Sequence, residues 1–569
     1  MCGVVGVWLR GRDRERALEA VERAAASLAH RGPDDRGVVE VASVKSRDSI
    51  VLGHRRLSII DLSEAGHQPM LDTETGNWIV YNGEVYNFRE IRAELESLGY
   101  RFRSDSDTEV ILLSYRQWGP DCVTRWRGMF AAAIWDEPRQ ELFLVRDRLG
   151  VKPLYYSYTD GTFLFASELR AIVETGLISP KLNVAALNAY LMFGAVQDPL
   201  TLIADVQALP AAHTLTVRDD GLKLQEYWEL PLGDGRYQEG HSSAEVERVA
   251  ERLKEAVSLR LVSDVPLGVF LSGGIDSSGL AMLMQRLSPQ QVKAFTIGFI
   301  NKKFDEATQA RQTALKLGVE HHSIMLTEAD MLASCEDAVD ALDQPSIDGI
   351  NTYYVSRSVK QAGITVALSG LGGDEAFCGY PHFRTIPRMR TFEHSYARLP
   401  YFIRQVGASL VGAGKSDKSS KIHALLLDEY GFTDPYFLAR ALFLPNQIAS
   451  LVEPDALLAI EYGAWGCRFR QIMARAEALD PINRISYLEL KTYIANTLLR
   501  DTDATSMAHS LEVRVPLLDH LLLEDVMRIA GRLKLRPKIT KPLLVNSLPG
   551  TLPRGVMSGP KRGFTLPFA

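Results

Sequence analysis

Long apolar runs are missing from this sequence, and no stretch approaches the roughly 18 apolar residues that a helix needs to span a bilayer. The first residues, MCGVVGVWLRGR, also lack the charged start and extended apolar stretch of a secretory signal peptide. We therefore expect a protein that neither spans a membrane nor leaves the cell by the secretory route.

Cysteine is scarce, and the few cysteines lie far apart. None of the five, at positions 2, 122, 335, 378 and 467, has a close partner of the kind that zinc sites and disulfide frameworks show. This spacing is typical of proteins in a reducing compartment, so we predict a cytoplasmic location.

Positive charge is not in excess. The 70 Asp and Glu residues outnumber the 64 Lys and Arg residues, and the net charge is −6. A nucleic-acid partner is not expected, because binding to a phosphate backbone requires a concentrated basic face. Apolar residues at 46% and charged residues at 24% are average for globular proteins, and 569 residues exceed what one hydrophobic core organises. We expect a folded chain with more than one domain.

The first part of the chain has the pattern of a sheet. Short runs rich in β-branched and aromatic residues, separated by turn signals, predict strands. The clearest of these runs lie at residues 50–52, 78–81, 130–135, 141–146 and 162–166. Helical periodicity covers two stretches, residues 14–28 and 88–98. The polar, Gly-containing segment PLGDGRYQEGHSS predicts a linker at residues 231–243, which places the first domain at residues 2–230.

The second domain, residues 244–569, alternates helical and strand patterns. An amphipathic stretch over residues 243–261 precedes the apolar run VPLGVFL, a helix through Met282, and the strand-like runs AFTIGF and ITVALSG. This alternation predicts an α/β core with a doubly wound parallel sheet that helices cover on both faces. Only helical periodicity is visible over residues 392–499, which predicts a helical extension.

A glycine-rich turn joins the run VPLGVFL to the next helix. A strand, such a turn and a helix N-terminus together direct backbone N–H groups and the positive end of the helix dipole at one point, where a phosphate is stabilised. The turn contains Ser272, Gly273, Gly274, Asp276 and Ser277. It lacks the lysine of the P-loop signature. The acidic side chain in a phosphate loop indicates a divalent cation between that carboxylate and the phosphates.

A second glycine-rich turn follows the strand-like run ITVALSG. It contains Ser369, Gly370, Leu371 and Asp374. Turns at the carboxyl ends of strands in a doubly wound sheet converge on the crevice where such sheets bind ligands. We therefore predict that Asp276 and Asp374 hold one Mg²⁺ ion. The alternative interpretation is two ordinary turns with solvated aspartates.

Cys2 precedes a small residue and becomes the first residue of the chain if the initiator methionine is removed. An α-amine has an ordinary pKa of about 7.7–8.0 and a thiol one of about 8.5, so proton transfer between them is nearly balanced at neutral pH. An N-terminal thiol activated in this way attacks an amide carbonyl without a histidine.

Several motifs carry a resemblance to known families. The segment SGGIDSS resembles the pyrophosphate-binding signature of ATP pyrophosphatases, which cleave ATP between its α- and β-phosphates and adenylate a substrate. The segments HRGPD, RLSI, YNGEVYN, SDTEV and RDRLGVKPL resemble, in this order, the class II glutamine amidotransferase domain. In combination, the whole chain resembles the glutamine-hydrolysing asparagine synthetase family. The resemblance implies an N-terminal-nucleophile αββα sandwich for the first domain, and a homodimer.

The resemblance also implies roles for individual residues. In the first domain, Cys2 would be the nucleophile, Asn82 and Gly83 the oxyanion hole, and Arg56, Glu84 and Asp107 would bind the α-carboxylate and α-ammonium of glutamine. In the second domain, the residues of the first glycine turn would hold pyrophosphate. Leu271, Ile297, Ser369 and Gly370 would lie at the adenosine, Lys561 would act in adenylate formation or amide transfer, and Asp503 and Arg514 would belong to the acceptor pocket.

The implied reaction is the ATP- and Mg²⁺-dependent conversion of aspartate to asparagine with ammonia released from glutamine. One position departs from the family pattern, because the second glycine turn carries Leu371 where the family has a glutamate. A leucine cannot act as a general base. Either Glu375 supplies the missing carboxylate, or the enzyme amidates another acid, such as a uronic acid of a surface polysaccharide. The segment DQPSIDGIN also lacks a basic residue that would bind aspartate, and the chain stops at Ala569, soon after the Lys561 segment. A non-catalytic regulatory homologue is a third hypothesis.

Overall fold

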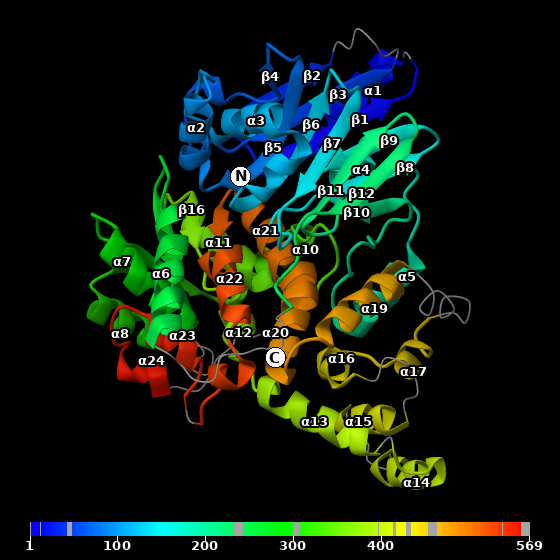
Figure 1. Cartoon of the computed structure of the whole chain (residues 1–569), viewed down its shortest axis with the longest axis vertical. Coiled ribbons are helices and arrows are strands. Elements are labelled where there is room, and N and C mark those ends of the chain that lie inside the picture. The colour runs from blue at the N-terminus through cyan, green and yellow to red at the C-terminus, as the bar shows by residue number, and fades with distance from the viewer. Residues whose placement is uncertain are drawn as a thin grey trace.

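The computed structural model describes residues 2–11, 13–41, 48–232, 243–299, 307–396, 398–412, 417–427, 434–452, 464–537 and 539–558. Figure 1 shows an upper half built from the N-terminal sheets and a lower half that contains the parallel sheet and most of the helices. The N label lies close to the joint between the two halves. The start of the chain is therefore near the place where the halves meet.

The N-terminal half contains two six-stranded antiparallel sheets. The first sheet has the order β10 (Val206–Ala208), β8 (Tyr155–Thr159), β9 (Thr162–Ala166), β1 (Gly3–Leu9), β3 (Ser49–Arg56) and β2 (Asp35–Glu40). The second has the order β12 (Gly221–Glu226), β11 (His213–Arg218), β7 (Glu141–Arg146), β6 (Gly128–Asp136), β5 (Asn77–Val85) and β4 (Met70–Asp72). All five strand runs expected from the sequence lie in these sheets.

The two sheets pack face to face, and helices cover both outer faces. Along β1, Val4 and Trp8 point into the core between the sheets, whereas Val5 and Val7 pack towards α1 (Arg14–Ser27). Beside α1 lies α4 (Leu169–Glu174), and α2 (Phe88–Ser97) and α3 (Asp107–Trp118) cover the second sheet. Further short helices are α5 (Val184–Phe193), η1 (Glu64–Gly66) and η2 (Gly119–Thr124). The expected αββα sandwich is confirmed.

The sequence predicted two helices in this half and missed α3. The helix begins after Ser106, whose side chain accepts a hydrogen bond from the N–H of Thr108. Most of its residues are buried, including the run from Val110 to Tyr115. A helix that is buried on nearly all sides shows no apolar stripe, so its periodicity is hidden in the sequence.

The C-terminal half is built on a five-stranded, fully parallel sheet. Its order is β15 (Glu320–Leu326), β14 (Lys293–Phe299), β13 (Leu267–Phe270), β16 (Val366–Leu368) and β17 (Glu512–Arg514). Helices α6 (Ser243–Leu259), α7 (Ile275–Leu287) and α8 (Ala307–Leu317) pack on one face, and α9 (Glu328–Ala333), α10 (Cys335–Asp340) and α11 (Ile350–Gln361) on the other. The strand order reverses at β13, as in doubly wound folds, which confirms the predicted core.

The remaining elements form the helical extension and the return to the sheet. They are α12 (Gly373–Ala376), α13 (His382–Tyr396), α14 (Tyr401–Gly412), α15 (Asp417–Leu427), α16 (Pro435–Arg440), α17 (Pro445–Ile448), α19 (Ala464–Ala476), α20 (Pro481–Glu489), the π-helix η3 (Leu490–Leu499), α21 (Arg500–Met507), η4 (Pro516–Leu518), α22 (His520–Met527), η5 (Gly531–Lys534), α23 (Pro542–Ser547) and α24 (Arg554–Ser558). In the described part of residues 392–499, every assigned element is a helix, as expected.

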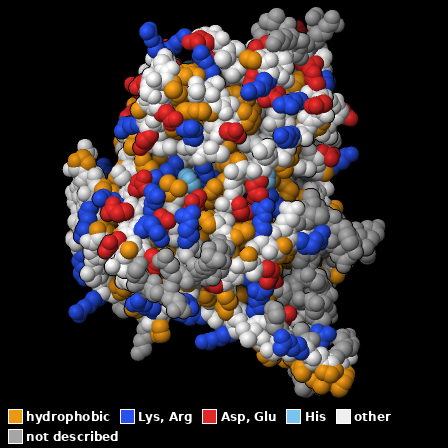
Figure 2. All heavy atoms as spheres, in the orientation of Figure 1, with side chains coloured by type: hydrophobic (Ala, Val, Ile, Leu, Met, Phe, Trp, Pro, Cys, Tyr) orange, Lys and Arg blue, Asp and Glu red, His pale blue; other side chains and the backbone are white. Residues whose placement is uncertain are grey.

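The surface in view carries charges of both signs. Figure 2 shows Lys and Arg side chains interspersed with Asp and Glu, without a basic stripe across the described part of that face. No helix within the described ranges has both the length and the apolarity that a bilayer crossing requires. The predicted linker at residues 231–243 lies mostly outside the described residues, and the domain limits stay predictions.

A buried carboxylate joins the two halves. Asp519, which caps α22, accepts hydrogen bonds from Nε and Nη2 of Arg127, both at 2.9 Å, and from Nη1 of Arg260 at 3.0 Å. Arg127 precedes β6 in the N-terminal half, and Arg260 follows α6. These two guanidinium groups lower the pKa of Asp519 against the opposing effect of its burial. Asp519 therefore pairs with one arginine from each half.

Replacing Asp519 by Asn removes the carboxylate that the buried Arg127 and Arg260 share, although Arg127 keeps its contact with Glu255 at 2.8 Å. Removing one partner of a buried ion pair costs about 3–5 kcal/mol, so we expect the free energy of unfolding to fall by that amount. Urea unfolding followed by tryptophan fluorescence measures it. The control is Asp219→Asn, which breaks the surface pair with Arg10 and has a cost of about 0–1 kcal/mol. Equal stability of the two variants would contradict this interpretation of the joint.

Candidate functional site

Cys2 lies directly before β1, at the inner end of the sandwich. Its backbone N–H donates to Oδ1 of Asn82 at 2.9 Å, and its carbonyl accepts from Nε of Arg31 at 3.0 Å. Burial raises the pKa of the Cys2 thiol, whereas a hydrogen bond from the backbone of Leu57 and the charge of Arg56 act in the opposite direction. Both backbone polar groups of the predicted nucleophile are thus fixed.

The predicted oxyanion-hole residues lie beside Cys2 on β5. Asn82 is fully buried, and its Nδ2 has no hydrogen-bond partner within the described part of the chain. A buried amide donor without a partner is costly, which indicates a place kept for a ligand oxygen. Gly83 has φ +155°, and a Cβ there would collide with the carbonyl oxygen of Met129 on β6. Only glycine lets the two strands approach this closely.

Arg56, at the end of β3, is held by the loop that follows it. Its Nη1 donates to the carbonyl of Ser63 at 2.9 Å, and its Nη2 donates to the carbonyl of Asp61. A Cβ on Gly66 would collide with this guanidinium group, so the turn around η1 wraps closely around it. These contacts hold Arg56 where its charge acts on the Cys2 thiol. Its predicted contact with the carboxylate of glutamine remains a proposal.

Two buried carboxylates face each other across the same site. Asp107, at the start of α3, accepts from the hydroxyl of Tyr81 at 2.8 Å and from the N–H of Val85 at 3.1 Å. Burial raises its pKa to about 6 against these hydrogen bonds. Burial and the neighbouring charge of Asp107 raise the pKa of Glu84 well above its usual range, which Arg514 opposes. The carboxyl oxygens of this pair can accept hydrogen bonds from an ammonium group.

Arg514 lies at this pair of carboxylates and not in an acceptor pocket. It is fully buried on β17, and its Nε donates to Glu512 at 2.6 Å while Nη2 lies 3.4 Å from Oε2 of Glu84. The edge strand β17 of the parallel sheet thus contacts the N-terminal half through Arg514. The sequence alone could not show this, because the contact with Glu84 joins residues that are 430 positions apart.

Asp503 also lies elsewhere than expected. It is buried on α21, and its two oxygens accept from Nη2 of Arg31 at 2.7 Å and from Nζ of Lys152 at 2.9 Å. Both partners belong to the N-terminal half. Neither Asp503 nor Arg514 lines the cavity between the two glycine turns, which is described below, so their predicted place in an acceptor pocket is wrong.

The two glycine turns do converge. Between β13 and α7, the hydroxyl groups of Ser272 and Ser277 lie 3.0 Å apart, and Gly273 adopts φ +74°. A Cβ on Gly370 would lie 2.9 Å from the Cβ of Asp276, and a Cβ on Gly373 would collide with the Asp276 carboxylate. The second turn needs its glycines because the first turn packs directly against it.

A cavity of about 280 Å³ opens between these turns. Its lining includes the predicted residues Leu271, Ser272, Gly274, Asp276, Ser277, Ile297, Ser369, Gly370 and Leu371. It also includes side chains that the sequence analysis did not assign, among them Asp348, Asn351, Thr352, Asp501 and Thr502. Three of these come from DQPSIDGINT, a segment that the sequence marked only for its lack of a basic residue.

Lys541 occupies the position predicted for a cation. Its Nζ contacts the carboxylate of Asp276 and lies 2.7 Å from Oδ1 of Asp374. Although burial opposes the charged form, these two carboxylates raise the pKa of Lys541. Nothing in the sequence distinguished this lysine from its neighbours. The predicted Lys561 lies outside the described residues.

The same two carboxylates fit Mg²⁺. They converge on one ammonium group, so they lie close enough to share a cation. Mg²⁺ prefers oxygen ligands and is commonly held by one or two carboxylates together with substrate phosphates. No cluster of three or more potential ligand side chains occurs in the described residues.

Glu375 is not among the residues that line the cavity. It is buried and accepts from the hydroxyl of Tyr380 at 2.6 Å. Burial and the charges of Asp374 and Glu489 raise its pKa to about 7. It lies on α12, four positions after Leu371.

Comparison with known proteins identifies both halves. A family model described as a glutamine amidotransferase domain matches residues 1–228, and one described as asparagine synthase matches residues 248–569. Asparagine synthetase [glutamine-hydrolyzing] 1 of Bacillus subtilis is 32% identical, with 100% of this chain and 87% of the relative covered. A putative asparagine synthetase [glutamine-hydrolyzing] 2 of Methanocaldococcus jannaschii is 35% identical over 82% of this chain and 90% of the relative. Amidase chry2 of Gibberella zeae is 30% identical over 92% and 80%, respectively.

Both domains occur in one chain, in the expected order, with relatives that align over nearly its whole length. The chain belongs to the glutamine-hydrolysing asparagine synthetase family and is an amidotransferase of the carbon–nitrogen ligase type.

Proposed function

We propose that the chain hydrolyses glutamine at Cys2 and uses the ammonia to amidate a carboxylate that ATP has activated at the glycine turns. The observation that carries this proposal is the pairing of two features. Among the described residues, the buried Nδ2 of Asn82 next to Cys2 has no hydrogen-bond partner, and a cavity lined by both glycine turns lies in the other half.

In the glutaminase half, the Cys2 sulfur attacks the side-chain amide carbon of glutamine. The thiol proton passes through the α-amine, which Asn82 Oδ1 holds in place, to the leaving nitrogen, and ammonia departs. The free Nδ2 of Asn82 and the N–H of Gly83 stabilise the oxyanion, and one such donor contributes about 3 kcal/mol to the barrier reduction. Water then cleaves the thioester and releases glutamate.

In the synthetase half, the first glycine turn binds pyrophosphate, and Leu271 and Ile297 contact the adenosine. An acceptor carboxylate oxygen attacks the α-phosphorus of ATP and pyrophosphate leaves. Ammonia attacks the acyl carbon of the adenylate and AMP leaves. Asp276 and Asp374 would hold Mg²⁺, which offsets charge on the pyrophosphate. Lys541 supplies a second positive charge at the same carboxylates.

Ammonia in bulk water becomes ammonium, which is not a nucleophile. We therefore propose a protected passage from Cys2 to the cavity through the joint between the halves. The enzyme acts in the cytoplasm as a homodimer on small-molecule substrates.

Aspartate is the first candidate acceptor, because its amidation gives asparagine, after which the family is named. The cavity favours a second candidate. Its described lining holds three acidic side chains, Asp276, Asp348 and Asp501, and no Lys, Arg or His that would pair with the second carboxylate of aspartate. Leu371 lines it where the family has a glutamate. A uronic acid has a single carboxylate and several hydroxyl groups. Its hydroxyl groups can donate hydrogen bonds to the acidic side chains of the cavity.

Replacing Cys2 by Ala separates the two half-reactions. We expect glutamine-dependent AMP formation to fall by more than about a thousandfold, because the nucleophile is lost. Activity with ammonium chloride should stay within about twofold, since the nucleotide cavity is unchanged. AMP and glutamate are measured together by chromatography. The control, Cys335→Ala, removes a thiol in the other half and should leave both activities intact. Equal loss of the ammonium-driven reaction in a folded Cys2 variant would contradict the division of labour.

Glutamine use should depend on the ionisation of Asp107. Its pKa of about 6 means that the carboxylate gains a proton as the pH falls through this value, and the attraction for the α-ammonium is then lost. We expect kcat/KM for glutamine to fall tenfold per pH unit below about pH 6, while ammonium-dependent turnover at saturating ammonia lacks this step. The variant Asp107→Asn should have a low kcat/KM without the step, and the exposed Asp105→Asn should retain it. The same step in Asp107→Asn would assign it to another group.

Pyrophosphate release identifies the acceptor. The enzyme is assayed with glutamine, ATP and Mg²⁺ and with aspartate, glucuronate or galacturonate in turn. Strong stimulation by a uronic acid and none by aspartate is the result that the cavity favours. Stimulation by aspartate alone would show that the acidic lining does not exclude a dicarboxylate. The variant Leu371→Glu restores the family residue and should shift the preference towards aspartate.

A further inference from the structure

Arg31 is a fully buried arginine that connects three parts of the molecule. Its Nε donates to the carbonyl oxygen of Cys2 at 3.0 Å, Nη1 donates to Glu168 at 2.8 Å, and Nη2 donates to Asp503 at 2.7 Å. Each nitrogen of the guanidinium group therefore has one acceptor. A planar fork with fixed directions holds such a set of partners in a single geometry.

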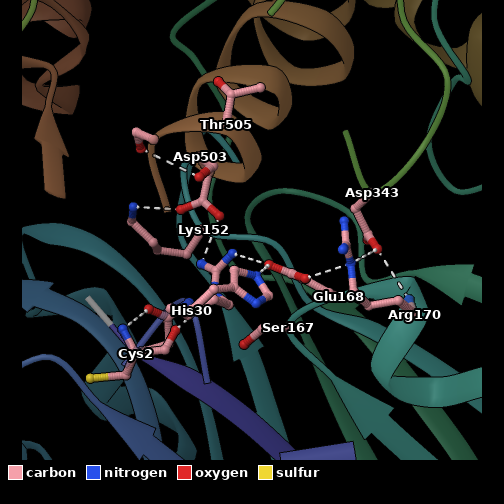
Figure 3. Close-up of polar contacts among 12 residues, drawn as sticks. Cys2, His30, Lys152, Ser167, Glu168, Arg170, Asp343, Asp503 and Thr505 are labelled. Atoms are coloured by element: carbon pink, nitrogen blue, oxygen red, sulfur yellow. Dashed lines mark hydrogen bonds and ion pairs between the residues drawn. The ribbon is translucent and has the colours of Figure 1, made fainter. Parts of the chain in front are cut away.

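The partner from the C-terminal half is Asp503. Figure 3 shows its carboxylate projecting from α21 towards Lys152, above Cys2. Lys152 Nζ donates to the second oxygen of Asp503 at 2.9 Å, and the side chains of Asp503, Lys152 and Arg31 are all at most 2% exposed. Arg31 and Lys152 lower the pKa of Asp503 against its burial, so it is ionised.

The helix that carries Asp503 also contributes to the nucleotide cavity. Asp501 and Thr502 line this cavity, two and one positions before Asp503 on α21. Asp501 is itself fixed by the hydroxyl of Ser346 and by Arg500 at 3.2 Å. One turn of a single helix thus contacts the cavity on one side and, through Arg31, the carbonyl of the nucleophile on the other.

Stability alone does not account for this arrangement. Replacing a buried ion pair by apolar residues is often neutral or stabilising, because desolvation of the charges offsets their attraction. A buried network is retained where it fixes one geometry. Here the geometry is that of Cys2, whose N–H is held by Asn82 and whose carbonyl is held by Arg31.

We propose that Asp503 is a positioning residue of the glutaminase site, supplied by the synthetase half. This inference rests on the proposed function. Asp503 orients Arg31, and Arg31 orients the backbone of Cys2, so that the sulfur faces the amide carbon of glutamine and the oxyanion donors. The glutaminase site is complete only when the two halves are docked.

The test must separate positioning from charge balance. Asp503→Asn alone leaves Lys152 buried without a counter-charge and risks misfolding. The double variant Asp503→Asn/Lys152→Met removes one charge of each sign. Its matched control is Lys152→Met, which keeps the contact between Asp503 and Arg31. The two variants differ only at Asp503.

We expect glutaminase kcat in the double variant to fall by about ten- to a hundredfold relative to Lys152→Met, the loss that a misplacement of roughly 1 Å produces. The KM for glutamine should change little, because Asp503 acts on Cys2 and not on the residues that face the substrate. AMP formation with ammonium chloride should stay within about twofold of the control. Arg31→Lys, which cannot serve three acceptors, should reproduce the loss in kcat.

Two results would overturn the proposal. One is equal glutaminase kcat in the double variant and in Lys152→Met. The other is a loss of glutaminase kcat in Asp519→Asn as large as that in the double variant, with both values expressed per folded molecule. Asp519→Asn weakens the joint without contacting Arg31. An inactive wild-type enzyme, with neither glutamate nor AMP formed, would instead refute the proposed function and is distinct from both results.

Discussion

Buried ion pairs across the joint between the two halves constrain nearly everything else in this molecule. Asp519 needs arginines from both halves, Asp503 needs Arg31 and Lys152, and Arg514 lies against Glu84. A charge buried without its partner costs several kcal/mol, so neither half can hold these side chains inside on its own. The joint is therefore specified by charge as well as by apolar packing, and a small shift between the halves would break several contacts at once.

This constraint places the chemistry at the joint. Cys2 precedes a strand of the sandwich, yet the groups around it include Glu512 and Arg514 from the last strand of the parallel sheet. In the proposed function, ammonia would therefore be released at the contact surface of the two halves. A site built from both halves also links two reactions that would otherwise waste glutamine or ATP, since misdocked halves would disorder the nucleophile and its oxyanion donors together.

Local patterns were enough to predict the architecture and much of the two reaction loops. The strand runs, the turns with Asp276 and Asp374, and Cys2 could be recognised because each depends on residues close together in sequence. The resemblance to a family supplied Asn82, Gly83 and Asp107. What failed depends on distance along the chain. Asp503 and Arg514 were assigned to the wrong pocket, because their partners Arg31 and Glu84 are more than 400 positions away. Helix α3 was missed because its burial on nearly all sides removes the periodicity.

Lys541 shows the same limit from the other side. The two glycine turns predicted a cation between their carboxylates, and the structure places an ammonium group there. The prediction gave the sign of the charge and named Mg²⁺ as its source, although two converging carboxylates demand compensation without specifying a metal or a lysine. In the proposed function, substrate phosphates would add negative charge at this point, and Asp276 and Asp374 would then hold the Mg²⁺ ion that offsets this charge. Lys541 compensates the same two carboxylates without a nucleotide, so the two turns can pack together before any phosphate binds.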